Sequence, residues 1–201
     1  MAAIILAGGE NRRMGRNKAF LPWKGRIFLW YIIGALSPLF REILLVTREP
    51  ERYAGFPVKV VCDLYPERGP LTGIFSGLSA SRDPKNFCVA CDMPMVRTEL
   101  VQYMMRRAGA ADALVAVIRG SSREDRPSVP QPLHAVYDQR CLPVMGRHLR
   151  EGRRGMQGVL RSLNTRFLEE GEMARMDPDL SSFVSINTVE DYQTLIADGA
   201  R

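Results

Sequence analysis

The residues best suited to chemistry stand near the beginning of the chain, where glycines and basic side chains follow a short apolar run. The stretch LAGGENRRMGRNKAFLPWKG begins at Leu6 and places Gly8, Gly9 and Gly15 among Arg and Lys side chains. Glycine lets backbone N–H groups approach a ligand, and clustered cations attract anions. The pattern therefore predicts a phosphate-binding loop. The alternative is a basic surface loop whose glycines only turn the chain.

This loop does not match the two most familiar phosphate-binding motifs. A Walker A loop ends in Gly-Lys-Ser/Thr, but Gly15 is followed by RNKA. The dinucleotide fingerprint G-x-G-x-x-G also fails, because Gly8 and Gly9 are adjacent. What remains is a strand, two glycines, an Arg-Met-Gly triplet and Lys18. At the carboxyl end of a first parallel strand, such a loop can wrap a triphosphate with N–H groups and cations.

Two aspartates follow apolar runs and are candidates for the same edge of a sheet. Asp92 follows Phe87–Cys91, and Asp63 follows Val58–Cys62. Because parallel strands end at one edge, Asp92 is expected beside the first loop, where magnesium needs only one or two carboxylates plus phosphate oxygens and water. Asp92 is therefore a predicted magnesium ligand. A cap on the following turn is the alternative for either aspartate.

The elements that would position these residues come from short apolar runs that alternate with helical patterns. This alternation predicts an α/β fold with a mostly parallel sheet, and the runs without period-two alternation are typical of strands covered on both faces. The predicted strands are Ala3–Ala7, Glu42–Val46, Val58–Cys62, Phe87–Cys91, Ala113–Ile118, Leu133–Tyr137 and a short Phe183–Ile186. The predicted helices are Phe28–Ser37, Leu71–Ser81, Thr98–Gly109, Asp138–Glu151, Met156–Asn164 and Val189–Ala197.

Length and composition limit the classes of protein that remain. The 201 residues fit one domain with a substantial core, and the net charge of +6 implies anionic partners. No signal sequence is recognisable, and the longest apolar stretch, Ile27–Leu36, is too short to span a bilayer, so a cytoplasmic protein without a membrane partner is predicted. That stretch is expected to be a helix that is buried or faces a partner subunit. The segment 119–132, rich in Ser, Pro and charge, is expected to be a surface loop.

Five motifs occur in a fixed order along nearly the whole chain. They are LAGG-x3-RMG-x2-KA from Leu6, RGPLTGI at Arg68–Ile74, CDMP at Cys91–Pro94, QPLHAVY at Gln131–Tyr137 and SINTVEDY at Ser185–Tyr192. Together they resemble the signature of the molybdenum cofactor guanylyltransferases and, more loosely, of relatives that act on other small phosphates. One departure is Ser185, where members often carry Asn. The resemblance implies a Rossmann-like three-layer α/β/α sandwich of the nucleotide-diphospho-sugar transferase type.

The resemblance also implies a reaction and its site residues. Residues 1–201 would form one nucleotidyltransferase domain, whose N-terminal part binds GTP and whose C-terminal part binds molybdopterin or the molybdenum cofactor. GMP would pass to the acceptor phosphate with magnesium as cofactor, and pyrophosphate would leave. Because the acceptor is already ionised near neutral pH, no general base is needed, and positioning and charge neutralisation do the catalysis.

The roles implied for individual residues fall into three groups. Those implied to be catalytic are Lys18 and Arg13, at the phosphates, and Asp92, at magnesium. The implied nucleotide contacts are Leu6, Ala7, Gly8, Gly9, Lys18, Asp63 and Asp92. The implied acceptor contacts are Gly15, Gly69, Gly73 and Asn187.

Several alternatives remain open at the level of sequence. Cytidylyl and other nucleotidyltransferases share the triphosphate motifs. The high pI also allows a nucleic-acid-binding module, although no groove-reading helix or aromatic platform is visible, and no nucleic-acid partner is predicted. The cluster of Arg147, Arg150, Arg153 and Arg154 is either a solvated helix end or a contact for an anionic acceptor or a carrier protein. Molybdoenzymes and cofactor-carrier proteins are further predicted partners.

Other reactive residue types have structural explanations. Cys88 and Cys91 have C-x-x-C spacing, but residues three apart in a strand point to opposite faces, so a redox or zinc pair is not predicted. The GIFSG stretch at 73–77 has its serine one place late for a nucleophile elbow. His134 and His148 are interpreted as structural or solvated residues.

Overall fold

A seven-stranded sheet forms the middle layer of the molecule in the order β5-β4-β1-β6-β8-β7-β9. The computed structural model describes residues 1–8, 17–119 and 128–199. Every neighbouring pair in the sheet is parallel except the two that involve β8, which confirms the predicted mostly parallel α/β sheet. The strands are β1 (Ala2–Leu6), β4 (Ile43–Thr47), β5 (Lys59–Cys62), β6 (Lys85–Ala90), β7 (Ala113–Ile118), β8 (Val129–Asp138) and β9 (Thr165–Leu168).

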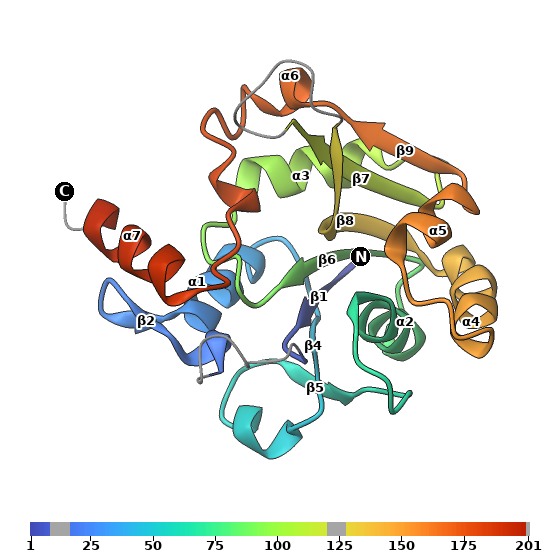
Figure 1. The fold of residues 1–201 in the computed structure, drawn as a ribbon, viewed down its shortest axis with the longest axis horizontal. Helices are drawn as coiled ribbons and strands as arrows, with labels where there is room; N and C mark the ends of the chain where they lie inside the picture. The colour runs from blue at the N-terminus through green and yellow to red at the C-terminus, as the bar shows by residue number, and fades with distance from the viewer. Residues whose placement is uncertain (9–16, 120–127, 200–201) are drawn as a thin grey trace.

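Helices cover both faces of this sheet, so the molecule has three layers (Figure 1). One face carries α1 (Phe28–Leu36) and α3 (Thr98–Arg107), and the other carries α2 (Pro70–Ala80), α4 (Leu142–Arg150) and α5 (Met156–Arg161). Successive strand residues point to opposite faces, so Ile5 packs on the α1 side and Ile4 packs on the α2 side. The three-layer sandwich expected from the sequence is confirmed. No helix among the described residues is long and apolar enough to cross a membrane.

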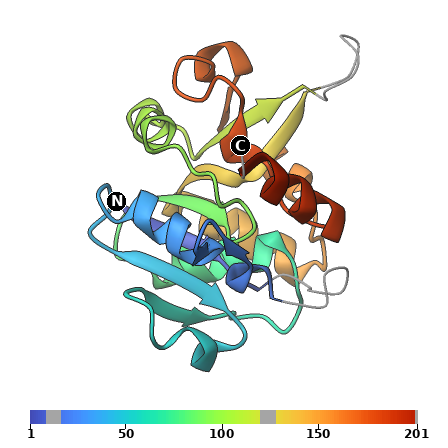
Figure 2. The same ribbon diagram turned by 90° about the vertical axis from the view of Figure 1, so that its left-hand side faces the viewer.

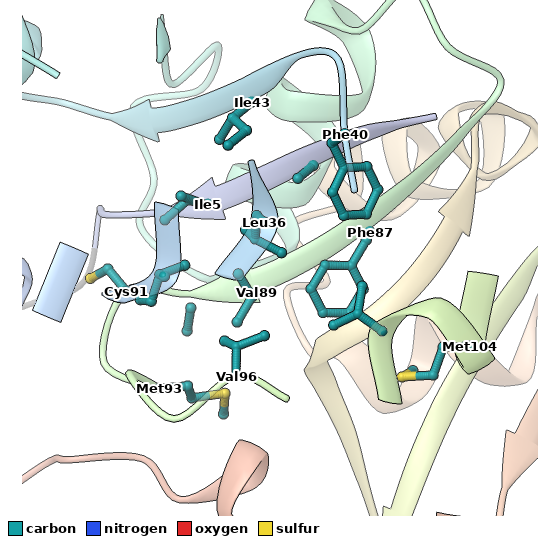
Figure 3. Close-up of a cluster of buried hydrophobic side chains, with 14 of the residues drawn as sticks. Ile5, Leu36, Phe40, Ile43, Phe87, Val89, Cys91, Met93, Val96 and Met104 are labelled. Atoms are coloured by element: carbon teal, nitrogen blue, oxygen red, sulfur yellow. The ribbon is translucent and has the colours of Figure 1, made fainter. Parts of the chain in front are cut away.

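The larger core lies between the sheet and the α1 and α3 layer. Figure 3 shows side chains from β1, β6, α1 and α3 converging there, together with Met93 and Val96 from the segment that follows β6. Phe40 and Phe87 stack with their ring centroids 6.2 Å apart. Because Met93 and Val96 are buried in this cluster, the turn that carries Asp92 is anchored on its C-terminal side.

The C-terminal helix α7 (Val189–Gly199) lies beside the small hairpin of β2 (Pro22–Trp23) and β3 (Arg26–Ile27), as Figures 1 and 2 both show. The Tyr192 hydroxyl donates to the Pro22 carbonyl at 2.5 Å, and Ile186 and Leu195 pack on Leu21 and Phe28. The start of α7 is thereby held near the residues that follow β1.

Several boundaries differ from those expected. Phe183–Ile186 is not a strand, because the Asp177 carboxylate accepts hydrogen bonds from the Ser181 and Ser182 amides and turns the chain into the 3-10 helix η4 (Ser181–Phe183). The loop expected over 119–132 is wrong at its end, because residues 129–132 belong to β8 and residues 129–131 pair with β7; residues 120–127 of that prediction lie outside the described residues. The expected helix from Asp138 begins later, since Asp138 ends β8 and η3 (Gln139–Cys141) precedes α4.

The short elements β2, β3, β9 and α6 (Glu170–Met173) had not been predicted, nor had the 3-10 helices at Lys18–Phe20 and Pro50–Tyr53. The helix predicted over Met156–Asn164 is present as α5, but it ends earlier, at Arg161. The apolar stretch Ile27–Leu36 was expected to form a buried helix, and this is confirmed, because five side chains of α1 are buried.

Candidate functional site

A cleft of about 540 Å³ opens at the carboxyl ends of β1 and β6. The chain passes from β1 to β4 on one side and returns from β5 through α2 to β6 on the other side. The connections therefore reverse direction between β1 and β6, which is where open α/β sheets bind ligands. The cleft is lined by Leu6, Ala7, Gly8, Asn17, Lys18, Val46, Asp63, Arg68, Gly69, Pro70, Gly73, Ala90, Cys91, Asp92, Leu133 and Asn187.

The segment Leu6–Gly8 forms the floor of the cleft. It is fixed from both neighbouring strands, because the Ala7 amide donates to the Val46 carbonyl at 2.8 Å and the Cys91 amide donates to the Leu6 carbonyl at 3.0 Å. A Cβ atom on Gly8 would lie 3.2 Å from Asp63 Oδ2. The absence of a side chain at Gly8 thus leaves room for the aspartate and exposes backbone to the cleft.

Lys18 is positioned by a cap on the short helix that contains it, η1 (Lys18–Phe20). Asn17 Oδ1 accepts from the Ala19 amide at 3.1 Å, and Asn17 Nδ2 donates to the buried Tyr53 hydroxyl at 2.9 Å. The Lys18 ammonium donates to Asp92 Oδ2 at 2.9 Å and to Asn187 Oδ1 at 2.6 Å. Three segments that are distant in sequence therefore meet at one ammonium group.

Asp92 follows β6 and has one oxygen free for a ligand. Its Oδ2 pairs with Lys18, whereas its buried Oδ1 has no hydrogen-bond partner among the described residues. A buried acceptor without a partner is costly, and a cation would satisfy it. No three His, Cys, Asp or Glu side chains gather into a metal-binding group in the described ranges. The donor set fits magnesium, which takes few protein carboxylates and relies on water and phosphate oxygens.

Asp63 stands on the opposite wall, just beyond β5. Its Oδ1 is also buried without a hydrogen-bond partner in the described part of the chain. Desolvation raises the pKa of the Asp63 carboxyl above its ordinary value, against the opposing effects of Arg48 and Ser76. The unpartnered oxygen of this carboxyl group can accept a hydrogen bond from a donor on a ligand.

The wall formed by the start of α2 carries the glycines predicted for the acceptor side. Gly69 precedes the helix with φ of +148°, a conformation that side chains disfavour. A Cβ atom on Gly73 would lie 3.1 Å from Leu6 Cδ2, so glycine there lets the helix approach β1. Both glycines line the cleft together with Arg68.

The structure brings most predicted site residues together. Leu6, Ala7, Gly8, Lys18, Asp63, Gly69, Gly73, Asp92 and Asn187 all line the cleft. Gly9, Arg13 and Gly15 lie outside the described residues. Asn17, which lines the cleft, and its partner Tyr53 had not been predicted as site residues. An Asn immediately before the lysine could have indicated a helix cap, but the partner of that cap, Tyr53, is visible only in the fold.

The other reactive side chains considered from the sequence form no site within the described part of the chain. Cys88 and Cys91 are buried, unpaired and on opposite faces of the sheet, as predicted, and burial raises the pKa of the Cys91 thiol to about 12. Ser76 in GIFSG donates to the Thr72 carbonyl at 2.8 Å and accepts from the Leu64 amide at 2.9 Å. That serine ties the loop after β5 to α2.

Sequence comparison with known proteins gives a consistent family of relatives. The family described as MobA-like NTP transferase domain matches residues 3–167. The molybdenum cofactor guanylyltransferase of Desulfosudis oleivorans is 34% identical over 194 residues, which cover 96% of this chain and 93% of the relative. The protein of the same name from Syntrophotalea carbinolica is 31% identical, with 96% and 89% of the two chains covered.

Solved structures share the fold at lower identity. Molybdopterin-guanine dinucleotide biosynthesis protein A from Archaeoglobus fulgidus superposes with a TM-score of 0.83 and 24% identity, covering 100% of this chain and 99% of that one. The 2-C-methyl-D-erythritol 4-phosphate cytidylyltransferase from Thermus thermophilus superposes with a TM-score of 0.73 and 18% identity, covering 100% and 98%. At these identities the likeness is one of fold.

Proposed function

Because the chain belongs to the MobA-like NTP transferases and is a nucleotidyltransferase, we propose that it transfers GMP from GTP to the phosphate of molybdopterin or the molybdenum cofactor. Pyrophosphate is the second product. One observation carries the proposal: Lys18 and Asp92 meet at 2.9 Å beside the glycine floor of the cleft. A cation for phosphates and a carboxylate for magnesium are the two groups that this reaction requires of a protein.

The transfer needs no general base from the protein, because the acceptor phosphate is already ionised. An oxygen of the acceptor phosphate forms a new bond to the α-phosphorus of GTP, and the bond from that phosphorus to the bridging oxygen of the leaving pyrophosphate breaks. Magnesium, when bound, neutralises charge on the phosphates. Lys18 binds the triphosphate and stabilises the negative charge that develops on it.

The remaining side chains and backbone groups hold the substrates in line. The backbone of Leu6–Gly8 contacts base and sugar, and Asp63 accepts a hydrogen bond from the nucleotide. Gly69 and Gly73 keep the α2 wall low enough for the bulky pterin of the acceptor. From the sequence we extend the proposal to Gly9 and Arg13 at the nucleotide and Gly15 at the acceptor.

The test is a pyrophosphate-release assay with each of GTP, CTP, UTP and ATP, in the presence and absence of molybdopterin. Release is expected only with GTP and acceptor together, and it should stop when EDTA removes magnesium. Release with CTP at an equal or higher rate would reassign the protein to the cytidylyl relatives. Release that persists in EDTA would remove Asp92 as a metal ligand. Contacts with molybdoenzymes or carrier proteins and a cytoplasmic location remain predictions.

A further inference from the structure

Asn187 contacts the reacting end of the cleft although it belongs to the last segment before α7. The Ile186 amide donates to the Asp92 carbonyl at 3.0 Å, which brings this segment alongside the turn after β6. From that position Asn187 Oδ1 reaches the Lys18 ammonium at 2.6 Å. The second partner of Lys18 is therefore supplied from 169 positions away in sequence.

The orientation of the Asn187 amide is fixed by its neighbours. Its Nδ2 donates to Ser185 Oγ at 2.9 Å, which leaves the carbonyl oxygen to face Lys18. Asp191 Oδ2 accepts from the backbone amides of Asn187 and Thr188, both at 2.8 Å, and these two bonds lower the pKa of the Asp191 carboxyl. The Asp191 amide donates in return to Thr188 Oγ1 at 3.1 Å, so the start of α7 forms a reciprocal cap.

We infer that Asn187 is a positioning residue for Lys18: its amide oxygen, oriented by Ser185 and held by Asp191, keeps the Lys18 ammonium in the cleft. This inference rests on the proposed function in placing a triphosphate beside Lys18. A free lysine side chain loses much rotamer freedom when it is fixed on a ligand. A lysine already held at 2.6 Å by Asn187 has lost part of that freedom before the ligand arrives.

A neutral partner is chemically suited to this task. Asp92 is the other partner of Lys18. When Asp92 also holds a cation, its negative charge is divided between that cation and the Lys18 ammonium. The amide of Asn187 carries no net charge, so it holds the ammonium without attracting the metal strongly or repelling the phosphates. Lys18 therefore retains one fixed partner when Asp92 takes up its second role.

The experiment measures binding in the absence of acceptor, so that an acceptor contact of Asn187 cannot influence it. Magnesium GTP and magnesium tripolyphosphate are titrated calorimetrically into the wild type, Asn187→Ala, Lys18→Ala and the double variant. Asn164→Ala, at an exposed asparagine between α5 and β9, is the matched control. Asn187→Ala is expected to weaken the binding of both ligands about three- to tenfold, since the ligand must then immobilise the long Lys18 side chain by itself. In the Lys18→Ala background the same change should have no further effect.

Three results would overturn the inference. One is unchanged binding in Asn187→Ala, with only the KM for acceptor raised, which would make Asn187 an acceptor ligand. Another is that Asn187→Ala weakens binding equally in the wild type and in the Lys18→Ala background. The third is that Asn164→Ala weakens binding as much as Asn187→Ala does. If Asn187→Ala does not fold, Ser185→Ala should show the weakening and Ser185→Thr, which keeps the hydroxyl, should not; equal binding by both would also overturn it. Faster pyrophosphate release with another nucleotide than with GTP would contradict the proposed function alone, because tripolyphosphate binding does not depend on a base.

Discussion

Lys18 and Asp92 are 74 positions apart in sequence, yet their charged groups meet at 2.9 Å with side chains that are only 14% and 17% exposed. Such a pair is held by the fold around it, through the Asn17 cap on one side and the buried Met93 and Val96 on the other. One oxygen of Asp92 remains buried and unpartnered within the described ranges. A site organised only for stability would have satisfied that oxygen.

At the level of single residues, Asp92→Asn separates a metal ligand from a structural cap. Asparagine has nearly the same volume and keeps an oxygen for Lys18, but it lacks the charge that holds a metal ion. Metal stabilisation of phosphoryl transfer is worth several kcal/mol, so turnover should fall on the order of a hundredfold or more. The melting temperature of the free protein should change little, because the lost ion pair is offset by removal of a charge that is costly to bury.

Turnover across a magnesium titration and the melting temperature of the free protein are the two measurements for Asp92→Asn. The wild-type response to magnesium should be absent or displaced to much higher concentration. A variant that melts much earlier yet keeps its turnover and its magnesium dependence would show that Asp92 is a structural cap.

At the level of elements, the sequence was informative where burial alone decides the structure. The runs at β1, β4, β6 and β7 are apolar on both faces, and they were predicted because helices cover both sides of the sheet. The pattern failed at β9, whose side chains Arg166 and Phe167 are exposed at the sheet edge, and at Phe183–Ile186, where Asp177 dictates a turn.

The candidate site, too, was predictable only in part. Glycines and charged residues at strand ends could be recognised, because parallel strands end at one edge. The hydrogen bonds that Lys18 donates to Asn187 and that Asn17 donates to Tyr53 could not be predicted, since they depend on how α7 and η2 (Pro50–Tyr53) dock. Side-chain partners between distant segments require the tertiary structure.

The packing of α2 on β1 gives a prediction about an element. A Cβ atom on Gly77 would lie 2.5 Å from Ile4 Cγ2 and 3.2 Å from Val46 Cγ2, all inside the smaller core. Gly77→Ala should destabilise the protein by about 1–3 kcal/mol through overpacking, which outweighs the gain in helix propensity. Gly34→Ala is the control, because no atom lies within 4 Å of its Cβ position in α1.

Chemical denaturation of both glycine variants measures this difference. Gly34→Ala should be as stable as the wild type or more stable by up to about 1 kcal/mol, since alanine is the better helix former. Equal stability of Gly77→Ala and Gly34→Ala would mean that α2 can shift away from β1 without cost, contrary to the close packing described.

At the scale of the whole molecule, the stability of the core should depend on pH through one histidine. His134 in β8 is fully buried, with its ring centroid 4.9 Å from that of Phe87 and 4.7 Å from that of Phe183. Neither ring nitrogen has a hydrogen-bond partner among the residues described. Burial therefore lowers the pKa of His134 to about 3.

The sign of the effect follows from the two states. Between pH of about 6.5 and 3, the unfolded chain binds a proton at His134 that the folded chain does not. Above pH 6.5 the neutral His134 does not reduce the free energy of unfolding. Below pH 6.5 the free energy of unfolding falls by about 1.4 kcal/mol for each pH unit, or roughly 2 kcal/mol at pH 5. For a chain of this length that loss lowers the melting temperature by about 4–8 °C.

His134→Leu isolates this contribution, because leucine is apolar and cannot be protonated. Melting temperatures at pH 7 and pH 5 are compared for both proteins, and the carboxylates that also titrate in this range are common to the two. The wild type should lose about 4–8 °C more than the variant on acidification, whatever their difference at pH 7. An equal loss in both proteins would mean that His134 takes up a proton in the folded state. Its side chain would then have to reach water or a hydrogen-bond acceptor, which the packing between Phe87 and Phe183 does not allow.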